Sequence, residues 1–87
     1  MAALSRRHLC ILEQVFEHPT RADLEREEAT ALLRALGAEL SEGRGSRLRV
    51  HLGGVRAVFH RPHPGKELRK YAVEDLRDYL KRTGITP

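Results

Sequence analysis

Apolar and polar residues alternate along two short runs, 47–52 and 55–60, which flank the pair Gly53-Gly54. A glycine pair between alternating runs is typical of a β-hairpin with a two-residue turn. Because side chains along a strand point alternately to opposite faces, this turn divides the hairpin into two surfaces. One surface is apolar and consists of Leu48, Val50, Leu52, Val55, Ala57 and Phe59. The other consists of Arg47, Arg49, His51, Arg56, Val58 and His60, with Arg47 directly opposite His60.

Three further segments have apolar residues at helical spacing, and we expect helices over 5–17, 26–36 and 71–83. The first ends before His18-Pro19, since the residue that precedes a proline is pushed out of the helical region. A short strand is expected over 38–41. The predicted order is helix, helix, three antiparallel strands, helix, which is an α+β fold. We expect the helices to cover the apolar face of the sheet and to leave the other face open to solvent.

Charge is distributed unevenly along the 87 residues, which are enough for one small domain. Residues 44–70 hold eight cations and a single acid, Glu67, whereas residues 1–43 hold five cations and eight acids. Like charges directly opposite each other destabilise a sheet, so the basic face indicates an anion as its partner. Because the guanidinium fork of arginine matches phosphate oxygens in pairs, we favour phosphate binding over a merely solvated surface.

Other features of the sequence argue against several classes of protein. Cys10 has no second cysteine with which to form an internal disulfide, and its apolar neighbours predict a buried thiol in a reducing compartment. No apolar run reaches the length of a membrane span, and the first residues lack the core of a signal peptide. No cluster of His and Cys has the spacing of a zinc site. We therefore expect a cytoplasmic protein without membrane contact, metal or other cofactor.

Three stretches of the sequence together resemble the HicA family of bacterial toxins. They are Leu32-Leu33-x-x-Leu36-Gly37-Ala38 before the first strand, Gly45-Ser46 at the start of the second, and Pro62-His63-Pro64-Gly65-Lys66-Glu67-Leu68 before the last helix, which is followed by Gly84-Ile85. The resemblance covers about residues 27–85. We accordingly assign residues 26–87 to a HicA-like toxin domain and residues 1–25 to a helical extension that packs on it.

The resemblance implies a fold like that of double-stranded-RNA-binding domains and an mRNA interferase that acts independently of the ribosome. It also implies a HicB-type antitoxin as partner, with contact to operator DNA only through the complex with that antitoxin. The family has a catalytic histidine directly after the Gly-Ser pair of the second strand. In this chain the position holds Arg47, which stays protonated and cannot act as a general base.

Three interpretations of the site remain open. In the first, His60 occupies the same surface position from across the hairpin and acts as acid and base, while Arg47 stabilises the transition state. In the second, the protein binds RNA, or duplex DNA as part of an operator complex, without cutting it. In the third, Arg47 only stabilises charge, and His51 or His63 transfers protons.

Additional polar and basic residues are candidate contacts to the RNA backbone: Arg44, Ser46, Arg49, His51, Arg56, Arg61, Lys66, Arg69 and Lys70. The last three precede the final helix, where domains of this type grip the phosphates of a duplex. The basic face is also suited to an acidic protein. We expect an antitoxin to place acidic side chains over Arg47, Arg49, Arg56 and His60, so that RNA and antitoxin compete.

Overall fold

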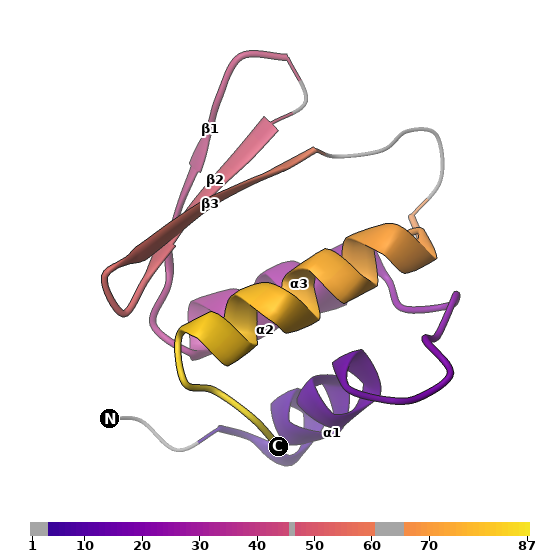
Figure 1. Cartoon of the computed structure of the whole chain (residues 1–87). Helices are drawn as coiled ribbons and strands as arrows, with labels where there is room; N and C mark the ends of the chain where they lie inside the picture. Colours follow the sequence, from indigo (N-terminus) through magenta and orange to yellow (C-terminus); the bar gives the residue numbers. More distant parts are fainter. Residues whose placement is uncertain (1–3, 46, 61–65) are drawn as a thin grey trace.

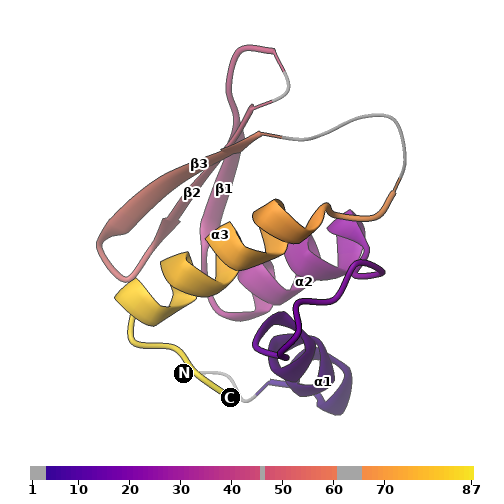
Figure 2. The ribbon, with the colours of Figure 1, turned by 45° about the vertical axis from the view of Figure 1, so that its right-hand side comes forward.

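The computed structural model describes residues 4–45, 47–60 and 66–87 of the chain. Within these ranges the elements follow the order α1 (Arg6–Val15), α2 (Arg26–Ala35), β1 (Glu39–Glu42), β2 (Arg47–Leu52), β3 (Val55–His60) and α3 (Lys70–Arg82). The α+β order predicted from the sequence is therefore confirmed. Figure 1 shows the sheet on one side of α2 and α3 and α1 on the other, and Figure 2 shows the same layers from a second direction.

The strands form an antiparallel sheet with β2 in the centre. β2 and β3 pair in the predicted register, beginning with Leu52 opposite Val55. The turn between them is Gly53-Gly54, with φ angles of 59° and 80°. This left-handed conformation is the one that glycine adopts without the steric cost of a Cβ. The sequence of the turn therefore fixes which side chains of the hairpin share a face.

The helices cover the apolar face of the sheet, as expected. Leu48, Val50 and Leu52 of β2 are buried in a single core that they share with side chains of all three helices. Burial stabilises a leucine or valine side chain by about 1.5–3 kcal/mol. Short helices are marginal on their own, so this shared core is what holds the three layers together.

A short bridge joins the segment before α2 to the segment before α3. The N–H of Leu68 donates to the C=O of Leu24 at 2.8 Å, and the N–H of Arg26 donates to the C=O of Lys66 at 2.7 Å. Both helices begin within a few residues of these bonds. The bridge therefore holds their N-terminal ends side by side.

The helical spacing predicts a stripe of Leu9, Leu12 and Phe16 on α1, with Ile11 and Val15 beside it, and the buried side is shifted from that stripe. Ile11, Leu12 and Val15 are buried, whereas Leu9 is 46% exposed and Cys10 lies on the surface. The expectation of a buried thiol is therefore wrong. Successive residues of an α-helix are rotated by about 100°, so Leu9 and Cys10 point away from the core when the helix packs through the other three.

Arg77 of α3 connects that helix to the end of α1 and to the loop that follows. It is 6% exposed. Its Nε donates to the C=O of Val15 at 2.9 Å, while Nη2 donates to the C=O of Glu17 at 3.1 Å and to Oγ1 of Thr20 at 3.0 Å. The carbonyls at a helix C-terminus lack partners within their own helix. A buried cation from α3 therefore supplies the donors that α1 needs.

We expect Arg77→Met to lower the free energy of unfolding by about 2–3 kcal/mol, because the hydrogen bonds from a charged group disappear and buried carbonyls are left unpaired. Urea titration followed by circular dichroism measures the change. Lys81→Met, at an exposed position of the same helix, should alter stability by less than about 0.5 kcal/mol. Equal effects of the two substitutions would contradict the role given to Arg77.

Tyr79 connects α3 to the hairpin. Its side chain is fully buried, and its ring packs edge-on against Phe59 with the ring centroids 5.7 Å apart. The hydroxyl donates to the C=O of Val55 at 2.7 Å. Burial raises the pKa of the Tyr79 hydroxyl above its ordinary value of 10.0, because the phenolate is poorly solvated there.

This raised pKa makes stability depend on alkaline pH. The unfolded chain loses the phenol proton near pH 10, and the folded protein loses it only at higher pH. The stabilisation is therefore complete below pH 10 and disappears as the pH rises through the folded pKa. We expect Tyr79→Phe to cost about 1 kcal/mol at pH 7 and to lose less stability than wild type above pH 10. Urea midpoints across this range measure both effects, and parallel declines in the two proteins would contradict the prediction.

Candidate nucleic-acid interface

The face of the sheet turned away from the helices carries the cations predicted for it. On this open face lie the exposed side chains of Arg47, Arg49, Arg56 and His60 and the half-buried side chain of His51. Among the residues that the structure describes, no carboxylate forms an ion pair with the three arginines. Their charges are therefore available to an external anion.

Arg47 and His60 are direct neighbours at the open end of the hairpin. The two-residue turn makes Leu52 and Val55 a hydrogen-bonded pair, and the two types of pair alternate along an antiparallel ladder. Arg47 and His60 consequently form a pair without mutual backbone hydrogen bonds, the type in which opposite side chains lie closest. This geometry allows an imidazole and a guanidinium to contact the same phosphate.

A shallow hollow of about 310 Å³ lies in the middle of the open face. Arg49, His51 and Arg56 line it, and β1 adds Glu39 opposite His51 and Ser41 opposite Arg49. Sequence reasoning did not place these two β1 residues on the face. Pairing a strand over 39–42 with β2 in the observed register would have placed both side chains on this face. The carboxylate of Glu39 makes the β1 margin less favourable for an anion than the centre and the β3 side.

The two histidines of the open face occupy separate positions. His51 lies four residues along β2 from Arg47, which corresponds to about 13 Å at the rise of a strand. A proton transfer group must come within hydrogen-bond reach of the reacting atoms. His51 therefore lies at a different part of the open face from the Arg47–His60 pair.

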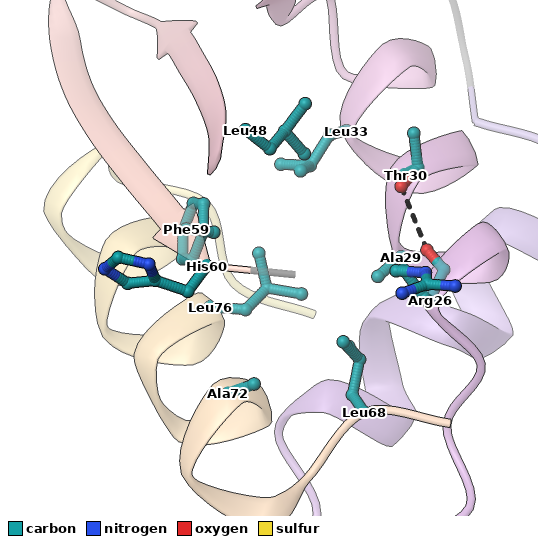
Figure 3. Close-up of a pocket in the computed structure, with 10 residues that line it drawn as sticks. All are labelled: Arg26, Ala29, Thr30, Leu33, Leu48, Phe59, His60, Leu68, Ala72 and Leu76. Atoms are coloured by element: carbon teal, nitrogen blue, oxygen red, sulfur yellow. Dashed lines mark hydrogen bonds between the residues drawn. The ribbon is translucent and has the colours of Figure 1, made fainter. Parts of the chain in front are cut away.

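His60 stands where the open face meets the interior. His60 lines a small apolar cavity of about 50 Å³, together with side chains of β2, β3, α2 and α3. Figure 3 shows Leu33, Leu48 and Leu76 around this cavity and the ring of His60 directed away from them. The packed strand thus fixes the position of His60, while the imidazole itself is exposed.

The remaining predicted contacts lie at the ends of other elements. Lys66, Arg69 and Lys70 are exposed at the beginning of α3, and Arg44 is exposed between β1 and β2. The first turn of α3 contains no acidic residue. Cations at the positive end of a helix dipole are unfavourable for stability by themselves, whereas a bound anion relieves the repulsion. Three predicted site residues, Ser46, Arg61 and His63, fall outside the residues that the structure describes.

The part of the chain that runs from α2 through the sheet to α3 matches a known protein family. The model of the HicA toxin family, whose members are toxins of bacterial toxin-antitoxin systems, matches residues 26–85. This chain belongs to the HicA family. No curated protein and no solved structure gives a significant match. The HicA match begins at Arg26, the first residue of α2, so α1 lies outside the matched region.

Membership of the HicA family makes this protein a toxin of a toxin-antitoxin pair, with an antitoxin as its partner, and a relative of RNase-type toxins. Across the described parts of the chain, no group of three or more His, Cys, Asp or Glu residues is arranged to hold a metal ion. In the same parts, no helix has the length and apolar character needed to cross a bilayer.

Proposed function

We propose that this HicA protein binds mRNA on the open face of its sheet and cleaves it without the ribosome. The observation that carries the proposal is the direct pairing of Arg47 with His60 on a face whose arginines have no carboxylate partner among the described residues. The family membership supplies the nuclease class. The site is proposed to act without a metal or other cofactor, in the cytoplasm.

Cleavage by such a site uses the RNA's own 2′-hydroxyl as the nucleophile. His60 takes the proton of this hydroxyl, and the oxygen attacks the adjacent phosphorus. Arg47 donates hydrogen bonds to the phosphorane oxygens as negative charge accumulates on them. The bond to the 5′-oxygen then breaks, the protonated His60 gives its proton to the leaving oxygen, and a 2′,3′-cyclic phosphate remains. In the other catalytic arrangement, His51 or His63 transfers protons and Arg47 only stabilises charge.

The proposal is tested by incubating purified protein with mRNA in the presence of EDTA. We expect wild type to cleave and His60→Ala to be slower by about 10²–10⁴-fold, the usual contribution of general acid–base catalysis. His18→Ala, at an exposed position between α1 and α2, is the matched control and should keep full activity. Undiminished cleavage by His60→Ala would assign proton transfer to another residue, and His51→Ala and His63→Ala then identify it.

A second candidate function is binding without cleavage, to RNA or to duplex DNA within an operator complex. It is favoured by Arg47 itself, which occupies the position where the family resemblance implies the catalytic histidine. This alternative predicts tight, salt-sensitive binding together with intact RNA and no growth arrest on overexpression. Toxicity that disappears with one histidine substitution would exclude it.

Binding of RNA to the open face is tested separately from cleavage by reversing two charges. We expect Arg49→Glu with Arg56→Glu to weaken binding of single-stranded RNA by more than tenfold and to reduce the slope of log K against log salt by about 0.7 for each phosphate that the protein no longer neutralises. Arg6→Glu with Arg7→Glu makes the same change in net charge at exposed positions of α1. Equal weakening by the two double variants would show that net charge, and not the open face, determines binding.

The antitoxin is proposed to be of the HicB type and to cover the open face with acidic side chains, with operator DNA contacted only through that complex. Arginine–carboxylate pairs at the centre of such an interface mainly control dissociation, and exposed cations such as Arg69 mainly control association. We therefore expect RNA and antitoxin to compete for binding to the wild-type protein. Simultaneous binding of both would place the antitoxin elsewhere.

A further inference from the structure

The outer edge of β3 is a row of backbone groups without a strand beside it. Since Leu52 and Val55 form a hydrogen-bonded pair, the N–H and C=O groups of Val55, Ala57 and Phe59 point to β2. Those of Arg56, Val58 and His60 point to the opposite side. No strand formed by the described residues pairs with that side, because the sheet order is β1-β2-β3. An unpaired edge of this kind is a template for an added strand.

A groove of about 550 Å³ runs between this edge and α3. Val58 and Tyr71, which line it from the two elements, are 54% and 52% exposed. Asp75, Asp78 and Arg82 line the same groove from α3 and are also exposed. The space beside β3 is thus bounded by unpaired backbone groups on one side and, on the other, by a partly apolar helix surface with two acidic residues and one cation.

We propose that β3 binds one antiparallel strand of a partner protein, with acidic residues on the side of the open face and basic residues on the side of α3. Residues opposite Arg56 and His60 have their side chains on the basic open face, where glutamate or aspartate is favoured. The intervening residues point toward α3, where lysine or arginine meets Asp75 and Asp78. The residue opposite Val58 is apolar. This inference depends on the edge, the groove and the charges of Arg56 and His60, and it requires neither RNA binding nor cleavage.

A second copy of the chain does not fit this pattern. A symmetric antiparallel pairing of two β3 strands centred on Val58 puts Arg56 of one copy opposite His60 of the other. Such pairing of basic residues is unfavourable, and charged residues on edge strands are a common means of preventing self-association. The charges of β3 therefore discourage a dimer while favouring a strand with the complementary pattern.

The experiment is an NMR titration of the full chain with a peptide of the sequence Glu-Lys-Val-Lys-Glu, blocked at both ends, up to millimolar concentration. We expect saturable shifts and slower hydrogen exchange at the amides of Arg56, Val58 and His60. Methylation of the peptide nitrogen at its central valine removes a hydrogen bond to Val58 and should weaken binding by about tenfold. A peptide of the same composition with the two lysines at its ends tests the charge pattern and should bind more weakly.

Val58→Pro supplies the reciprocal variant, since it removes the outward N–H and leaves the ladder to β2 intact. Val58→Thr keeps that N–H and is the control. Loss of binding in the first variant but not in the second supports strand addition. If Val58→Pro does not fold, the methylated peptide still decides. Each of four results would overturn the proposal. The peptide causes no shifts, the methylated peptide binds equally well, the shifts are confined to Arg49 and His51, or the protein alone shows shifts that depend on its concentration.

Discussion

The period of two along the hairpin is the constraint on which the rest of the structure depends. The left-handed Gly53-Gly54 turn fixes Leu52 opposite Val55, and a shift of one residue would turn every side chain to the other face. Such a shift would bury arginines in the core and expose leucine and valine to water. The same register that closes the core therefore gathers the cations on the open face. The packing of the core and the charge of the open face share one geometric cause in this hairpin.

Two side chains of α3 hold the layers at fixed positions around that hairpin. Tyr79 reaches the C=O of Val55 on the sheet side, and Arg77 reaches the C=O of Val15 on the opposite side. α3 thus contacts the strand that carries His60 as well as the helix that precedes the HicA-matched region. This arrangement makes α1 part of the common core, although it lies outside the residues by which the family is recognised.

The charge distribution separates two surfaces of different character. The open face presents exposed arginines, with Glu39 at its β1 margin. The groove beside β3 combines backbone groups with the carboxylates of Asp75 and Asp78. A polyanion is repelled by these carboxylates, whereas a polypeptide strand with alternating charges is not. The open face therefore favours anionic groups, the groove favours such a strand, and the two surfaces meet at His60.

The sequence by itself determined the order of elements, the register of the hairpin and the composition of the basic face. These depend on local rules: helical spacing, alternation with period two and the conformational freedom of glycine. It could not determine the exposure of Cys10 or the buried position of Arg77. Which side of α1 is buried depends on how the helix docks, and Arg77 finds its acceptors about sixty residues earlier in the chain. Only tertiary packing brings such groups together, because no local pattern records a contact between distant segments.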